Sequence, residues 1–74
     1  MNRDYEKQIG KKICALRDKK GMTQEQLSAK LQVHGCDLTR SAIAKIEVGQ
    51  RHIYPDELKF IAEILGVSYQ DILD

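Results

Sequence analysis

The sequence predicts an all-α domain built from five short helices. In several segments apolar residues recur at the three- and four-residue spacing of one helix face, and one pattern of helix start occurs four times. No segment alternates apolar and polar residues over four or more positions, as a half-buried strand does. With 74 residues, one Phe, three Tyr and no Trp, the chain is expected to form one small domain around an aliphatic core.

The first helix is expected over about residues 5–20. Ile9, Ile13 and Leu16 stand at positions i, i+4 and i+7, so they share one face of a helix. Gly21 follows and is expected to end the helix, because glycine readily adopts the left-handed conformation found after helix C-termini.

The second helix, expected over 24–31, has the most complete start signal. Thr23 and Gln26 form a T-x-x-Q capping box, in which each side chain accepts a backbone N–H from the other residue. Met22 and Leu27 occupy the two positions of a hydrophobic staple, an apolar contact across the start of a helix.

The same staple spacing marks the starts of three further helices. The expected helices and their apolar pairs are 40–48 with Leu38 and Ile43, 55–65 with Ile53 and Leu58, and 69–73 with Val67 and Ile72. Thr39 and Ser68 are good caps for the first and last of these. Tyr54 is a poor cap, but Pro55 suits the first position of a helix.

The segment from Thr39 to Gly49 is distinguished by what its outer face offers. Ala42, Ile43 and Ile46 share the face expected to pack. The opposite face carries two cations, a hydroxyl and two small apolar groups: Arg40, Ser41, Ala44, Lys45 and Val48. Because contacts with base edges in a DNA major groove need this mixture, the segment is predicted to be a recognition helix.

Net charge does not by itself indicate a nucleic-acid partner. The 12 Lys and Arg residues and 11 Asp and Glu residues give a formal charge of +1. Basic residues are nevertheless concentrated in the first segment and in the middle of the chain, whereas acidic residues lie toward its end. We therefore expect a molecule with one basic side.

Four stretches make the chain similar to the helix-turn-helix domain of the XRE family, which includes Cro and the lambdoid phage repressors. They are I-G-K-K-I-C-A-L-R at 9–17, G-M-T-Q-E-Q-L at 21–27, S-A-I-A-K-I-E at 41–47 followed by Gly49, and E-L-K-F-I-A-E-I-L-G-V-S at 57–68. The resemblance covers nearly the whole chain. It implies one domain over 1–74 with a compact lambda-repressor-like fold, in which the second and third helices form the helix-turn-helix.

The resemblance also implies roles for individual residues. Three residues of the third helix fall where family members contact bases: Arg40, Ser41 and Lys45. Gln24 matches a glutamine that binds a DNA phosphate and braces the recognition helix. Arg17 and Glu47 match a pair that forms a partly buried ion pair between the first and third helices, although they could instead be independent surface charges.

Other expected DNA contacts have simpler alternatives. Ala44 could touch a thymine methyl group, or it could simply favour the helix. Phosphate contacts are expected from Gln24, Thr23, Gln50 and Arg51. Gln50 and Arg51 could instead only keep their loop soluble, and the cations of the third helix could form an ordinary solvated face.

The connection between the second and third helices departs from the family pattern. Gln32 occupies the position of the usual turn glycine, and V-H-G-C-D-L at 33–38 makes the connection longer than the family norm. Gly35 is expected to make the turn instead. The longer loop could change the angle of the recognition helix, or it could itself contact DNA or a partner.

Other classes of function are not expected. His34, Cys36, Cys14 and His52 lack the spacing of a structural zinc site, and both cysteines are expected to be idle thiols. Without a catalytic set or a phosphate-binding loop, we expect no enzyme activity, cofactor or small-molecule substrate. No segment resembles a signal peptide or a membrane span, so a cytoplasmic protein without membrane contact is expected.

The combined features predict sequence-specific binding of double-stranded DNA by a small transcriptional regulator. Because one recognition helix contacts few base pairs, a homodimer on a two-fold symmetric operator is expected. The alternative is a helix-turn-helix module that binds protein, such as an antitoxin or an anti-repressor partner. The near-neutral charge and the long loop favour the alternative, whereas the cationic outer face of the third helix opposes it.

Overall fold

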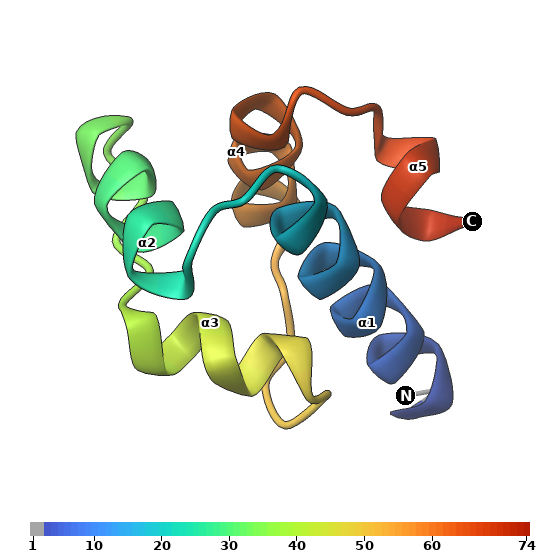
Figure 1. The fold of residues 1–74 in the computed structure, drawn as a ribbon. Helices are drawn as coiled ribbons and strands as arrows, with labels where there is room; N and C mark the ends of the chain where they lie inside the picture. The colour runs from blue at the N-terminus through green and yellow to red at the C-terminus, as the bar shows by residue number, and fades with distance from the viewer. Residues whose placement is uncertain (1–2) are drawn as a thin grey trace.

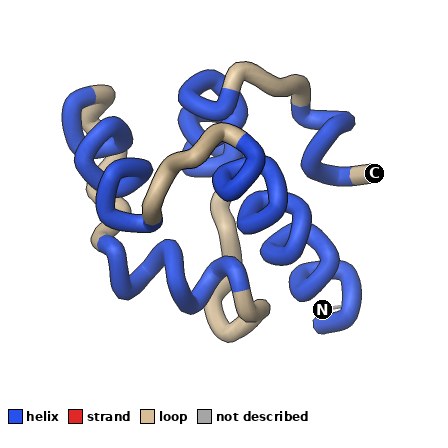
Figure 2. The backbone as a smooth tube through the Cα atoms, in the orientation of Figure 1, coloured by secondary structure: helices blue, strands red, loops and turns tan. Residues whose placement is uncertain are grey.

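A computed structural model describes residues 3–74 and shows five helices over that range (Figure 1). They are α1 (Arg3–Lys19), α2 (Gln24–Val33), α3 (Arg40–Glu47), α4 (Pro55–Leu65) and α5 (Tyr69–Leu73). Figure 2 shows that loops connect the helices and that this part of the chain contains no strand. The prediction of an all-α fold with five helices is confirmed.

Three helices have limits that differ from the expected ones. α1 runs from Arg3 to Lys19 rather than over 5–20, and α3 ends at Glu47 rather than at residue 48. α2 continues to Val33 instead of ending at residue 31, because the glycine that ends it is Gly35. The limits of α4 and α5 coincide with the expected ones.

Side-chain caps fix the starts of α2 and α3. Thr23 Oγ1 accepts the N–H of Gln26 at 3.0 Å, and Gln26 Oε1 accepts the N–H of Thr23 at 2.8 Å. Thr39 Oγ1 caps α3 by accepting a backbone N–H at 3.1 Å. At the start of α4, where Tyr54 offers no side-chain cap, Glu57 Oε1 accepts the Tyr54 N–H at 3.0 Å. The starts of α2, α3 and α4 are therefore determined by residues close to them in the sequence.

The core is aliphatic and draws on every helix. The most deeply buried side chains are Ile13, Leu27, Leu31, Leu38, Ile43, Ile61, Leu65 and Ile72. Both residues of each predicted staple belong to this core or pack against it. Through these contacts α3 packs on both α1 and α2, while α1 also packs on α5. Within residues 3–74, no helix is both long and apolar enough to span a lipid bilayer.

Gly10 allows α1 and α3 to approach closely. A Cβ atom added at Gly10 would lie 2.8 Å from the carbonyl oxygen of Glu47, and the carbonyl oxygen of Ile46 would be nearer still. Any other residue at this position would thus overlap the backbone of α3. Figure 1 shows α1 crossing close to the C-terminal end of α3, which is where these two carbonyl groups lie.

We expect Gly10→Ala to destabilise the fold by about 1 to 3 kcal/mol, because an added methyl group would push α1 away from α3. Alanine favours a helix over glycine by about 1 kcal/mol, so a net loss of stability in Gly10→Ala would show the effect of the tight contact. Urea unfolding followed by circular dichroism measures the change.

Lys11→Ala is the matched control for this substitution, since Lys11 is the next residue of α1 and is exposed. Its effect should stay within about 0.5 kcal/mol. A Gly10→Ala protein as stable as the unmodified one would contradict the need for close approach.

Candidate nucleic-acid interface

The two faces of α3 have opposite characters. Ile43 and Ile46 are 1% and 2% exposed, so the inner face is part of the core. Ala44 is half-buried. The exposed side chains of the outer face are Arg40, Ser41 and Lys45, and Val48, the residue after the helix, is 56% exposed. The structure thus brings the predicted base-contacting residues together on one solvent-facing side of a short helix.

The cations of this outer face have no acidic partner within residues 3–74. Neither Arg40 nor Lys45 takes part in a salt bridge or a side-chain hydrogen bond with a described residue. Their donors are therefore available to an external acceptor. Arginine and lysine are the residues that most often donate to guanine O6 and N7 in a major groove.

Arg17 of α1 and Glu47, the last residue of α3, form a buried ion pair. Arg17 Nε donates to Glu47 Oε2 at 2.7 Å, and Arg17 Nη2 donates to Glu47 Oε1 at 3.0 Å. The two side chains are only 10% and 4% exposed. Arg17 Nη1 also donates to the carbonyl oxygen of Met22 at 2.7 Å. One guanidinium group therefore joins α1, the turn before α2, and the end of α3.

Gln24 adds α2 to this network. Its Nε2 donates to Glu47 Oε1 at 2.9 Å, so the side chain lies against the end of α3. The family resemblance implied a phosphate-binding and bracing glutamine here. One amide hydrogen is already used within the protein, whereas the amide oxygen and the second amide hydrogen have no partner among the described residues.

The hydrogen bonds of the network determine the ionisation of Glu47. Burial alone would raise the pKa of this carboxyl group, but hydrogen bonds from Arg17 and Gln24 outweigh burial and hold the pKa below its usual value. The hydrogen bond to Glu47 likewise raises the pKa of Arg17. Both groups are therefore charged at neutral pH.

The residues expected to contact phosphate have different surroundings. Thr23 caps α2, and Gln50 is exposed just after α3. Arg51, by contrast, donates to both carboxylate oxygens of Glu57, at 2.9 and 3.1 Å, and its guanidinium lies over the ring of Tyr54. The cation of Arg51 is thus engaged inside the protein. Local sequence gave no sign of this pairing, because it depends on where α4 begins.

The connection between α2 and α3 is ordered by glycine and by the core. Gly35 has φ +81°, and the N–H of Cys36 donates to the carbonyl oxygen of Leu31 at 2.9 Å, which closes the end of α2. The turn thus lies at Gly35, as the sequence indicated. Cys36 and Leu38 are then 7% and 1% exposed, so the longer loop is anchored in the core at two points.

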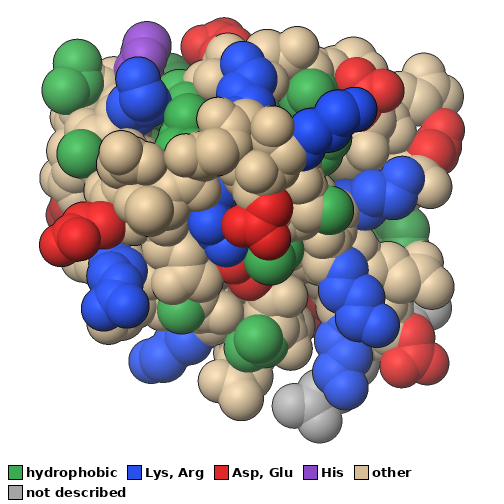
Figure 3. All heavy atoms as spheres, viewed as in Figure 1, with side chains coloured by type: hydrophobic (Ala, Val, Ile, Leu, Met, Phe, Trp, Pro, Cys, Tyr) green, Lys and Arg blue, Asp and Glu red, His purple; other side chains and the backbone are tan. Residues whose placement is uncertain are grey.

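Charge on the visible face of the molecule is mixed. Figure 3 shows many Lys and Arg side chains on this face, several of them over the region occupied by α1, with Asp and Glu side chains between them. The exposed lysines of α1 are Lys7, Lys11, Lys12 and Lys19. On this face, therefore, positive charge occurs in local groups and not as a uniformly positive surface.

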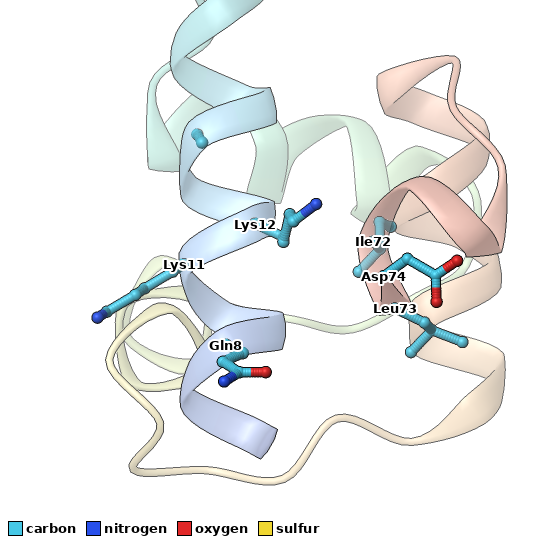
Figure 4. Close-up of a pocket in the computed structure, with 7 residues that line it drawn as sticks. Gln8, Lys11, Lys12, Ile72, Leu73 and Asp74 are labelled. Atoms are coloured by element: carbon cyan, nitrogen blue, oxygen red, sulfur yellow. The ribbon is translucent and has the colours of Figure 1, made fainter. Parts of the chain in front are cut away.

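A second surface feature is a depression of about 320 Å³ between α1 and α5. Ile72 and Leu73 line it from α5, and Gln8 and Lys12 line it from α1. In Figure 4 Lys12 points from α1 toward α5 and Ile72 points from α5 toward α1, while Lys11 points away from α5. The depression is formed by helices other than α2 and α3, so it is separate from the outer face of α3.

Known proteins resemble this chain in sequence and in structure. The model of a helix-turn-helix family matches residues 15–72. The control protein C.BamHI of Bacillus amyloliquefaciens is 37% identical over 67 residues, which cover 89% of this chain and 76% of that protein. The crystal structure of the DNA-binding domain of BldD superposes with a TM-score of 0.84 and 26% identity, covering all of both chains.

We expect loss of either member of the Arg17 and Glu47 pair to cost about 3 kcal/mol at neutral pH, because the remaining charge would be buried without its partner. The double variant Arg17→Met/Glu47→Gln should lose less than the sum of the two single losses. Chemical unfolding of the four proteins measures this coupling. Strictly additive losses would mean that the two charges act independently.

The same pair should make stability sensitive to acid. Because the folded state lowers the pKa of Glu47 from 4.5, the carboxylate stabilises the fold above that pH, and this contribution is lost as the pH falls through the folded-state value. The stability difference between the unmodified protein and Glu47→Gln should therefore be largest near neutral pH and shrink in acid. Unfolding curves across this range test it.

Glu63→Gln is the control for the pH experiment, since Glu63 is an exposed carboxylate of α4. Its stability difference should be small and nearly constant over the same range. A difference for Glu47→Gln that stays constant down to strong acid would contradict a lowered pKa.

Proposed function

This chain belongs to the XRE-type helix-turn-helix family, and from that premise we propose that it is a transcriptional regulator that binds double-stranded DNA in a sequence-specific manner. The observation that carries the proposal is the outer face of α3, where Arg40, Ser41 and Lys45 are exposed and the two cations have no acidic partner within residues 3–74. Both proteins reported above support it, one as a control protein and the other as a DNA-binding domain.

We place α3 in the major groove. An α-helix with its side chains is about 10 to 12 Å across, which fits a groove about 12 Å wide, and the N-terminal residues of such helices usually make the base contacts. Arg40, in the first turn, would read guanine with two parallel donors. Ser41 and Lys45 would make further polar contacts, and Ala44 would lie close to a thymine methyl group.

The N-terminus of α2 would bind the DNA backbone. Backbone N–H groups and the helix dipole favour an anion at this end, and Thr23 and Gln24 are the side chains beside it. Exposed Gln50 would contact phosphate from the other end of α3. We leave Arg51 out of this set, because its guanidinium is bound to Glu57.

We propose that the regulator acts as a homodimer in the cytoplasm. Two half-sites one helical turn apart bring two recognition helices to successive major grooves, which multiplies both affinity and specificity. Tyr69, 48% exposed at the start of α5, and the neighbouring depression between α1 and α5 offer an apolar surface away from α3. A second copy of the chain would cover this surface.

Binding to a protein partner is the second candidate function. Val33, 86% exposed at the end of the lengthened α2, and the near-neutral charge favour it. Selection of bound sequences from a random DNA pool separates the two functions. An enriched, two-fold symmetric sequence supports the regulator, and absence of enrichment at every salt concentration leaves the protein-binding function.

We expect Arg40→Ala and Gln24→Ala to weaken DNA binding in different ways. A bidentate arginine contact with guanine discriminates between bases by about 1 to 3 kcal/mol, so loss of Arg40 should lower the ratio of specific to non-specific affinity. A phosphate contact is common to all sequences, so loss of Gln24 should lower both affinities while sparing more of the ratio. Titration of selected and scrambled DNA at one salt concentration measures both.

Lys20→Ala is the charge-matched control for Arg40→Ala. Lys20 is exposed and its ammonium group lies near Gly66, between α4 and α5. The ratio should be unchanged in this variant. If the ratio of specific to non-specific affinity fell equally in Lys20→Ala and Arg40→Ala, Arg40 would contribute only its positive charge and not a contact with a base.

For the proposed dimer we expect Tyr69→Asp to yield monomers, because a carboxylate in an apolar contact would lose its hydration. Sedimentation equilibrium over a range of protein concentrations measures the mass. Val33→Asp, which places the same charge on α2, should leave the association unchanged. Dimers of equal stability in both variants would place the interface elsewhere than α5.

A further inference from the structure

Two side chains of α2 bind one backbone carbonyl group of the lengthened loop. Ser28 Oγ donates to the carbonyl oxygen of Leu38 at 2.7 Å, and Gln32 Nε2 donates to the same oxygen at 3.3 Å. Ser28 and Gln32 are four residues apart, so they stand one turn from each other on the same face of α2. We refer to these two donors and their shared acceptor as the carbonyl clamp.

The acceptor and one donor of the clamp are buried, whereas Gln32 is exposed. Ser28 is 9% exposed, which is unusual for serine, and its hydroxyl group is bound to the loop and not to its own helix. The acceptor residue is buried as well, with Leu38 at 1% exposure. A carbonyl oxygen in such a position is costly unless donors reach it.

The rest of the Leu38 peptide is also fixed. The Leu38 side chain belongs to the core, and its N–H donates to the carbonyl oxygen of Cys36 at 2.9 Å. Thr39, the next residue, is the cap of α3. The orientation of the Leu38 carbonyl therefore sets the direction in which the chain enters α3.

The clamp depends on two features of this chain. Gln32 carries a side-chain amide donor, which a glycine at this position would not supply. Residues 34–39 connect α2 to α3, and the carbonyl group of Leu38 is the point at which this connection is attached to α2. Ser28 and Gln32 provide that attachment.

We propose that Ser28 and Gln32 are positioning residues that fix the angle of α3 to the rest of the domain, and that this angle contributes to discrimination between DNA sequences. The second half of the proposal rests on the proposed DNA-binding function. Neither residue needs to touch DNA, because each acts through the Leu38 carbonyl group. Ser28 makes the shorter hydrogen bond and is buried, so its removal should have the larger effect.

The experiment compares Ser28→Ala, Gln32→Ala and the double variant with the unmodified protein. Ile61→Val, a core change in α4, is the control for lost stability, since Ile61 is 1% exposed and belongs to neither α2 nor α3. All measurements are made at a temperature where every protein is folded by circular dichroism. If the double variant does not fold, Ser28→Ala alone serves, because Gln32 then still reaches the carbonyl oxygen.

The first measurement needs no DNA. Residual dipolar couplings of backbone amides report the orientation of α3 relative to α1 and α4 in the free protein. We expect the double variant to change this orientation and Ile61→Val to leave it unchanged. An orientation of α3 in the clamp variants that equals that of the unmodified protein would overturn the proposal, whatever the DNA measurements give.

The second measurement is the ratio of affinities for selected and scrambled DNA. One hydrogen bond corresponds to roughly a fivefold effect, so the double variant should lose at least about that factor in the ratio. In each single variant the logarithm of the affinity ratio should fall by less than half as much as in the double variant, because the remaining donor still holds the acceptor. A ratio unchanged in the double variant would overturn the link to specificity.

The two proposals fail in different ways. If the unmodified protein prefers no DNA sequence while α3 still reorients in the clamp variants, the positioning role holds and the proposed function fails. If the unmodified protein selects DNA and the clamp variants select it equally well with α3 in place, the proposed function holds and the positioning role fails.

Discussion

The buried carboxylate of Glu47 is the interaction on which the arrangement of the helices depends. It receives two hydrogen bonds from Arg17 of α1 and one from Gln24 of α2, while its own backbone ends α3. Hydrogen bonds to a charged acceptor are about twice as strong as neutral ones, and burial limits screening by salt. Three helices are thus oriented by one side chain, and Gln24 connects this internal network to the surface where DNA would lie.

The need for such attachments follows from the size of α3. A helix of eight residues is not stable alone, because nucleation is unfavourable and few backbone hydrogen bonds follow it. Its stability comes from packing: Ile43 and Ile46 fill the core, the backbone near its end lies against Gly10, and the loop before it is held by Leu38. The contacts that stabilise α3 are made by its inner face and its two ends. Its exposed side chains are therefore not needed for stability.

The sequence predicted those features that are local. Staples and caps gave the starts of α2 to α5 because their signals lie within five or six residues, and Gly35 gave the position of the turn after α2, although the end of α2 was expected two residues too early. Contacts made outside the helix starts left no periodic signal in the sequence. The close approach at Gly10 depends on how α1 and α3 cross. The pairing of Arg51 with Glu57 and the hydrogen bonds to Leu38 depend on the conformations of the loops before α4 and α3, which the spacing of apolar residues does not encode. The pairing of Arg17 with Glu47, thirty residues apart, was accessible through family resemblance alone.

The fastening of α3 at both ends has a thermodynamic consequence for any ligand that it binds. Ordering a flexible segment on binding reduces affinity by the entropy that the segment loses, and a protein whose competent state is rare binds more weakly in proportion to that rarity. The backbone of α3 is already held by Glu47 and by the loop at Leu38, so it loses little freedom on association. Mutual fit must then come from rotation of exposed side chains and from deformation of the ligand. The stiffness of the ligand therefore contributes to the selectivity of binding.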